Sequence, residues 1–174
     1  MRDEAAFVEF AEAVRERLRR TAYLMCGDWD LASDHVQEGL IRVYVAWPRL
    51  TRAGREYAYA RKAVVSAFLD HSRRRSSTEL PTEVDANVPS GLDVAESVAS
   101  RAALMAALAT LPSRQRACVV LRYFEDLSVA DTAAVLGCSE GTVKSQTSRA
   151  LASLRSLFEG SPVGELMVEG ASSW

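Results

Sequence analysis

The sequence predicts an all-α protein with two small helical domains joined by a flexible linker. Three observations lead to this fold class. Apolar residues recur at helical spacing over most of the chain, no stretch shows the alternation of a strand, and an aperiodic segment interrupts the helical pattern near the middle. We place the first domain at residues 1–75, an acidic flexible linker at 76–95, the second domain at 96–159 and a tail at 160–174.

The first domain is expected to be a bundle of three or four helices. Two amphipathic helices come first, with a break at Gly27 and with Asp30 or Ser33 as the cap of the second helix. Pro48 is expected to end that helix, and a third helical pattern covers residues 57–74. The apolar stripes of the first two helices are Phe7, Phe10, Ala11, Val14 and Leu18, and Val36, Leu40, Val43, Tyr44 and Trp47.

Charge is distributed unevenly along the chain. The formal net charge of −2 and the pI of about 5.8 are not typical of a DNA-binding protein, which usually has a basic surface. Basic residues nevertheless gather between residues 61 and 75, whereas residues 76–100 contain acidic residues and no basic ones. A basic surface for phosphate can therefore coexist with an acidic surface for a protein partner.

The composition predicts a folded, cytoplasmic protein that needs no cofactor. Hydrophobic residues make up 48% of the chain, no apolar run reaches the roughly 18–20 residues of a membrane span, and the N-terminus lacks the basic start of a signal peptide. Cys26, Cys118 and Cys138 have no metal-ligand spacing, and His35 and His71 are expected to be isolated. Because no motif for a metal, an activated nucleophile or a phosphate loop is found, the sequence does not favour an enzyme.

A helix-turn-helix is predicted in the second domain. Ser128 followed by Asp131 is typical of a helix start, and the helix of about two turns then ends at Gly137, which can adopt a left-handed turn. Ser139 is a good cap for the next helix, which continues to Phe158. The inward stripe of this second helix would be Val143, Thr147, Ala150, Leu151, Leu154 and Phe158.

The outward face of this last helix is suited to DNA. Small polar residues let a helix approach a base pair closely, and longer side chains around them can donate to phosphates and base edges. Periodicity alone fits an ordinary solvated helix equally well, so the types of side chain decide the interpretation. The residues assigned to the DNA-reading face are Ser139, Thr142, Lys144, Ser145, Gln146, Ser148 and Arg149.

These residues carry a resemblance to a known family. The stretch LPSRQRACVVLRYFEDLSVADTAAVLGCSEGTVKSQTSRALASLR resembles region 4 of the extracytoplasmic-function (group 4) sigma factors of the bacterial sigma-70 family. The stretches DLASDHVQEGLIRVYVAW and ARKAVVSAFLDHSRRR resemble the polymerase-facing helix and the promoter-reading helix of region 2. With the linker in its expected place, the resemblance covers nearly all of residues 5–158.

The resemblance implies a role in transcription initiation. In this family region 2 binds a coiled coil of the largest polymerase subunit and recognises and opens the minus-10 element, while region 4 binds the polymerase flap and reads the minus-35 element. The implied core-polymerase contacts are Asp34, Gln37 and Glu38. The implied minus-10 and melting residues are Tyr57, Tyr59, Arg61, Lys62, Arg73, Arg74 and Arg75, of which the two tyrosines would contact unpaired bases.

The implied partners are core RNA polymerase and promoter DNA, and regulation by an anti-sigma factor or by the chain's own expression is left open. Trp47 is a further candidate base platform, although its place on an apolar stripe favours the core. Two other functions also stay open. A dimeric repressor or response-regulator output module would contain a similar helix-turn-helix but leaves residues 28–75 unexplained. A helical adaptor could bind polymerase without touching DNA.

Overall fold

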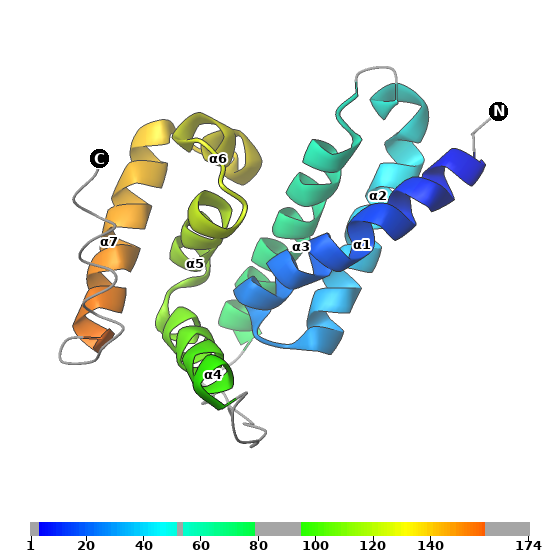
Figure 1. Ribbon diagram of the computed structural model, residues 1–174. Helices are drawn as coiled ribbons and strands as arrows, with labels where there is room; N and C mark the ends of the chain where they lie inside the picture. The colour runs from blue at the N-terminus through cyan, green and yellow to red at the C-terminus, as the bar shows by residue number, and fades with distance from the viewer. Residues whose placement is uncertain (1–3, 52–53, 79–94, 159–174) are drawn as a thin grey trace.

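The computed structural model describes residues 4–51, 54–78 and 95–158. Within these ranges every regular element is a helix, which confirms the predicted all-α class. Figure 1 shows two groups of helices, α1–α3 and α4–α7, which lie side by side. The elements are α1 (Glu4–Cys26), α2 (Trp29–Leu50), α3 (Glu56–Thr78), α4 (Ala95–Thr110), α5 (Ser113–Val119), a π-helical turn η1 (Val120–Phe124), α6 (Val129–Leu136) and α7 (Glu140–Phe158).

The cap of α2 is Asp28, so the prediction of Asp30 or Ser33 was wrong. Gly27 ends α1 in a left-handed conformation (φ 77°), and this leaves Asp28 extended just before the helix. The Asp28 carboxylate then accepts from the amides of Asp30 and Leu31, both at 2.8 Å. The Ser33 hydroxyl instead donates to the Trp29 carbonyl at 2.8 Å, inside the helix.

Both predicted ends of the next helices were too early. Helix α2 continues through Pro48, because a proline in the last turn removes only one amide donor and the Thr51 amide still reaches the Trp47 carbonyl at 3.2 Å. Helix α3 continues to Thr78, so the first residues of the predicted linker are helical. The remainder of that linker up to residue 94, and the predicted tail at 160–174, lie outside the described residues.

Trp47 belongs to the core of the α1–α3 group. It is 4% exposed, and its ring lies 5.4 Å from that of Phe7 and 5.2 Å from that of Phe10, measured between centroids. Edge-on and tilted packing of this kind stabilises aromatic clusters. The structure therefore places Trp47 in the core, and the alternative role as a base platform was wrong.

Two further apolar cores order the rest of the molecule. One lies within the α4–α7 group, and the other joins the two groups where α1 and α3 meet α5, η1 and α6. The first consists of Ala107, Leu108, Leu111, Val119, Ala150 and Leu154. The second, which we name the junction core, consists of Met25, Val65 and Phe68 packed against Ala117, Val120, Leu121 and Val135. The two groups are thus held in a closed arrangement with shared apolar packing.

His35 and His71 form a contact pair, contrary to the expectation that they are isolated. Their ring centroids are 5.5 Å apart, on α2 and α3, and His35 is only 3% exposed. The Nε2 atom of His35 has no hydrogen-bond partner among the described residues. Burial lowers the pKa of His35 below 6.5, and the neighbouring His71 lowers it further, although Glu38 and Asp34 oppose the shift.

We expect the close crossing of α2 and α3 to depend on Gly39. A Cβ atom there would lie 2.6 Å from Val64 Cγ2, so Gly39→Ala should lower the free energy of unfolding by roughly 1–2 kcal/mol, since overpacking outweighs the gain in helix propensity. Gly141→Ala is the matched control, because its nearest contact would be 3.8 Å away, and it should be neutral or slightly stabilising. Urea unfolding of both variants tests this, and equal stabilities would contradict it.

We also expect the buried His35 to make stability depend on pH. Its lowered pKa means that the unfolded chain takes up a proton near pH 6.5 while the folded chain does not, so stability falls as the pH drops below about 6.5. Each pKa unit of lowering corresponds to about 1.4 kcal/mol. His35→Gln should flatten the stability curve between pH 7 and pH 5 in denaturant titrations. A variant curve parallel to that of the wild type would show that His35 is not the source.

Candidate nucleic-acid interface

The helix-turn-helix forms as predicted, and its turns are fixed by local hydrogen bonds. Helix α6 begins at the Ser128 cap, whose hydroxyl accepts from the Asp131 amide at 3.0 Å, and ends at Gly137 with φ 62°. The Ser139 hydroxyl accepts from the Thr142 amide at 3.1 Å and so caps α7. Both helices of the motif are therefore oriented by their own turn residues.

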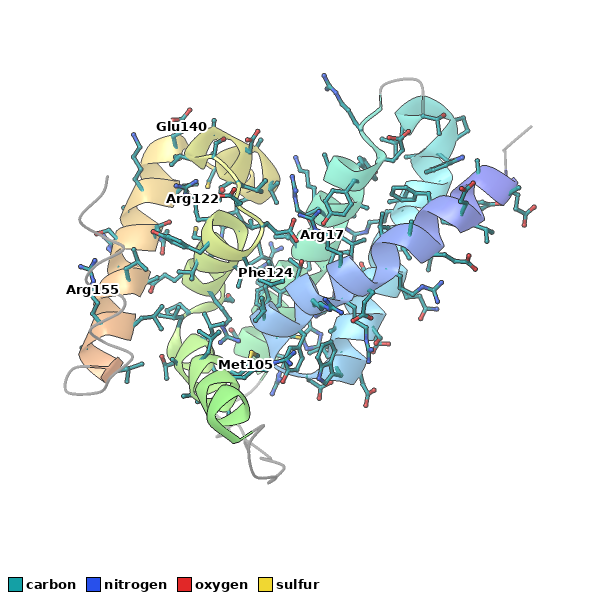
Figure 2. All side chains as sticks on the ribbon, viewed as in Figure 1. Arg17, Met105, Arg122, Phe124, Glu140 and Arg155 are labelled. Carbon is teal, nitrogen blue, oxygen red and sulfur yellow. The ribbon has the colours of Figure 1, made fainter. Side chains whose placement is uncertain are left out.

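Helix α7 has the two faces that its sequence predicts. Val143, Ala150 and Leu154 are buried, Thr147 and Leu151 are half-buried, and only the side chain of Phe158 lies outside the described residues. On the other face Ser139, Lys144, Ser145, Ser148 and Arg149 are exposed, while Thr142 and Gln146 are half-buried. Figure 2 labels Glu140 and Arg155 near the two ends of this helix, which lies on the far side of its group from α1. The predicted DNA-reading face is thus open to solvent.

The predicted minus-10 residues on α3 are not brought together by the structure. Tyr59 and Lys62 are exposed near the start of the helix, whereas Arg73, Arg74 and Arg75 are exposed near its end. Lys62 and Arg73 are eleven positions apart along the helix, or roughly 16 Å along its axis. Arg73 forms an ion pair with Asp70, and Arg74 Nε donates to the Asp70 carbonyl at 3.3 Å. Lys62 and the three arginines therefore offer separate places for DNA phosphates.

The other two members of this set, Tyr57 and Arg61, face a carboxylate from the α4–α7 group. Glu125 follows η1, and its side chain is 1% exposed. The Thr21 hydroxyl donates to Oε1 of Glu125 at 2.6 Å, and the Tyr57 hydroxyl donates to Oε2 at 3.2 Å. The guanidinium groups of Arg17 and Arg61 lie 3.1 Å and 3.4 Å from Oε2. We name these five residues the Glu125 cluster.

The half-buried ring of Tyr57 is in contact with both arginines of the Glu125 cluster. The guanidinium carbons of Arg17 and Arg61 lie 4.8 Å and 5.5 Å from its centroid, at distances typical of cation–π contacts. Burial raises the pKa of Tyr57 to about 12, and the Glu125 carboxylate adds to the rise, so the hydroxyl stays a donor at neutral pH. In this arrangement Tyr57 is not free to stack on a base, while Tyr59, 39% exposed, is accessible.

Comparison with known proteins assigns both groups of helices to one family. Residues 10–78 match the family model of Sigma-70 region 2, and residues 101–154 match that of Sigma-70, region 4. Over 157 residues the chain is 41% identical to the RNA polymerase sigma-E factor of Streptomyces avermitilis, which covers 87% of this chain and 86% of that protein. It is 32% identical to the ECF RNA polymerase sigma factor SigM of Mycobacterium tuberculosis, with coverages of 90% and 79%.

The chain belongs to the extracytoplasmic-function group of the sigma-70 family. A solved structure shares its fold: the sigma factor RpoE of Bartonella quintana, in complex with the anti-sigma factor NepR, matches with a TM-score of 0.63 and 22% identity. The match covers 89% of this chain and 98% of that chain. Helices α1–α3 are thus region 2 of a sigma factor, and α4–α7 contain region 4.

Region 4 is tied to region 2 by a second polar group, the half-buried Arg116. Its guanidinium donates to the Met25 carbonyl at the end of α1 at 2.6 Å, and to the carbonyls of Ala109 and Leu111 near the end of α4 at 2.8 Å and 3.0 Å. Burial lowers the pKa of Arg116, although the group stays a cation in proteins. Charged donors of this kind satisfy carbonyls that a helix end leaves unpaired.

The predicted polymerase contacts of region 2 lie between two hollows of the α2 surface. Gln37 lines a groove of about 1040 Å³ between α1 and α2, together with the exposed apolar residues Val8 and Ile41. Asp34 and Glu38 line a second hollow of about 530 Å³ beside the end of α3. Asp34 and Gln37 are exposed and Glu38 is half-buried, so all three side chains are accessible to a partner on α2.

We also looked among the described residues for reactive thiols, metal ligands and membrane-spanning helices. Cys26, Cys118 and Cys138 are unpaired thiols, and burial raises the pKa of Cys118 to about 11. In the part of the chain that the structure describes, no group of three or more His, Cys, Asp or Glu side chains could hold a metal ion. None of the described helices is long and apolar enough to cross a membrane.

Proposed function

We propose that this chain is the promoter-recognition subunit of a bacterial RNA polymerase. It binds the core enzyme, recognises the minus-35 and minus-10 elements and promotes opening of the DNA. The observation that carries this proposal is the presence of sigma-70 regions 2 and 4 in one chain, at 41% identity to an RNA polymerase sigma-E factor. The chain itself breaks no bond, and it acts in the cytoplasm with the polymerase.

Region 4 would read the minus-35 element through α7. The proposed contacts are the residues that cap or line its outer face: Ser139, Thr142, Lys144, Ser145, Gln146, Ser148 and Arg149. Their support is chemical and geometric, since short hydroxyl side chains permit close approach to base edges while Lys144 and Arg149 donate to phosphates or guanine. The exposure of this face leaves it available without rearrangement of region 4.

Region 2 would hold the opened minus-10 element. The proposed contacts are Tyr57, Tyr59, Arg61, Lys62, Arg73, Arg74 and Arg75. Unstacking a base costs a few kcal/mol, and stacking on an aromatic ring returns about 1–3 kcal/mol per base. Tyr59 is the exposed ring that can provide this, with Lys62 one turn away to hold a neighbouring phosphate. Binding energy for single-stranded DNA would thus stabilise the open promoter.

Core polymerase would bind region 2 along α2. Asp34, Gln37 and Glu38 offer polar contacts, and the adjoining groove exposes Ile41, 57% accessible, and Val8, 47% accessible. Apolar groups of this size with polar residues around them are typical of a protein interface. The proposed domain boundaries follow the helices: region 2 ends with α3, and the second domain begins with α4.

An anti-sigma factor is the proposed regulator. The Bartonella sigma factor with the same fold was solved with an anti-sigma factor bound. In this chain the exposed apolar residues of α1 and α2 would give such a protein a surface that competes with polymerase. Control of the chain's own expression is compatible with the same role.

Run-off transcription with core polymerase tests the proposed function. With a genomic fragment library as template, transcripts with defined starts are expected only when this chain is added to the core enzyme. Core polymerase alone is the control. If the chain binds the core enzyme but yields no promoter-dependent transcript from any fragment, it is an adaptor and the proposal is wrong.

The double variant Lys144→Ala, Arg149→Ala tests the role of α7. Each lost contact should cost about 1–3 kcal/mol if it reads a base, or reduce the salt dependence of binding if it contacts a phosphate. We therefore expect at least a tenfold loss of transcription from a promoter with a minus-35 element. The matched control replaces Arg20, which is ion-paired with Glu16 on α1, and Arg101, which is exposed on α4. Neither residue belongs to the surfaces proposed for DNA or for polymerase. Unchanged transcription in the α7 variant would contradict DNA reading by this helix.

A further inference from the structure

The Glu125 cluster brings four donors of region 2 onto one carboxylate. Thr21 and Arg17 come from α1, and Tyr57 and Arg61 come from the first turns of α3. Their hydroxyl and guanidinium groups all point to Glu125, which arrives from region 4. Figure 2 shows Arg17 and Phe124, the neighbour of Glu125, where the two groups of helices meet. Without Glu125, region 2 would present a preformed set of anion donors.

Glu125 does not use the full donor capacity of this set. Hydrogen bonds from a guanidinium to a carboxylate are typically about 2.7–2.9 Å long, but the contacts from Arg17 and Arg61 measure 3.1 and 3.4 Å. The Nε atom of Arg61 is buried and has no hydrogen-bond partner among the described residues. A larger anion with more acceptor oxygens would therefore satisfy donors that a carboxylate leaves unused.

We propose that these four side chains form a phosphate-binding site of region 2, which Glu125 occupies in the closed arrangement. When regions 2 and 4 separate, a backbone phosphate of the opened promoter takes the place of the carboxylate. The inference rests on the proposed function and extends it: Glu125 and DNA compete for the same donors. Arginine forks and hydroxyl groups bind carboxylate and phosphate by the same geometry, which makes the exchange chemically straightforward.

The position of the site favours DNA as the source of the phosphate. Arg61 lies within one helical turn of Tyr59 and Lys62, which are exposed on α3 outside the cluster. A strand that stacks a base on Tyr59 would bring its backbone close to these basic residues. The site is thus continuous with the proposed surface for the opened minus-10 element.

The competition between Glu125 and DNA blocks a site on region 2 but leaves the DNA-reading face of region 4 accessible. The outer face of α7 is exposed in the closed arrangement, whereas Arg61 is 12% exposed and Thr21 is 1% exposed. The isolated chain should therefore bind single-stranded DNA weakly through region 2. Removing the charge of Glu125 should release the site.

Oligonucleotide binding by the full chain tests the proposal. The probe is a fluorescein-labelled single-stranded DNA of mixed sequence, measured by anisotropy at several salt concentrations, because phosphate contacts do not depend on sequence. Glu125→Gln should bind the probe at least about fivefold more tightly than the wild type, with a steeper salt dependence by about 0.7 for each phosphate gained.

Asp126→Asn is the matched control for net charge. Asp126 is the exposed neighbour of Glu125, has φ 52°, a conformation that Asn tolerates, and lies outside the cluster. This variant should bind the probe like the wild type. If it gains as much affinity as Glu125→Gln, the effect is general electrostatics and the proposal is wrong.

A second pair of variants tests whether Arg61 causes the increase in affinity for the probe. Adding Arg61→Gln to Glu125→Gln should abolish the increase in affinity, whereas adding Arg15→Gln should preserve most of it. Arg15 is an exposed residue of α1 that lines the groove toward α2, on the other side of the helix from the cluster. Equal losses in the two double variants would overturn the assignment to Arg61.

Hydrogen exchange on the wild-type chain keeps the proposal testable if Glu125→Gln does not fold. Saturating probe should raise amide exchange over residues 120–127, because Glu125 leaves region 2 when DNA binds. If the probe binds and exchange over residues 120–127 is unchanged, Glu125 and DNA do not compete.

The outcomes also distinguish this proposal from the proposed function. The phosphate-site proposal is wrong, and the sigma role stands, if the chain directs transcription but Glu125→Gln gains no affinity for the probe. The sigma role is wrong, and the phosphate site stands, if Glu125→Gln binds the probe more tightly but run-off assays yield no promoter-dependent transcript.

Discussion

The closed arrangement depends on the burial of one carboxylate, that of Glu125. An uncompensated buried charge costs several kcal/mol, so its position is stable only where region 2 supplies donors. Thr21, Tyr57 and two arginines supply them, and this requirement fixes α1 and α3 against η1. The junction core adds apolar burial beside the charge. Polar pairing sets the register of the two regions, and apolar packing adds to their affinity.

Glu125 reaches region 2 because the backbone around η1 departs from an α-helix. The Glu125 amide bonds to the Val120 carbonyl five residues back, and the Leu127 amide bonds to the Leu121 carbonyl six residues back. Asp126 then takes a positive φ, and the chain turns toward the Ser128 cap of α6. A π-helical turn of this kind re-aims a side chain at a functional site. The same turn that begins the helix-turn-helix therefore also delivers the carboxylate.

Features that depend only on residues close together in the sequence could be predicted from it. The caps Ser128 and Ser139, the left-handed Gly137 and the buried stripe of α7 are all local features, and each was predicted. The Asp28 cap was missed because two later residues have similar capping chemistry. Contacts between distant segments carry no such signal. The resemblance assigned Arg61 to the minus-10 contacts without showing that Glu125, 64 residues away, meets it.

The same limit explains the contact between His35 and His71, which depends on how α2 crosses α3. Arg116 also joins segments that are far apart in the sequence. Arg116 binds carbonyls at the ends of both α1 and α4, and Glu125 binds Arg61 near the start of α3. These ties and the junction core must break together, because each keeps the others in register. Separation of the two regions should then be an all-or-none transition between a closed and an open state, and a ligand can shift their ratio only by its difference in affinity for them.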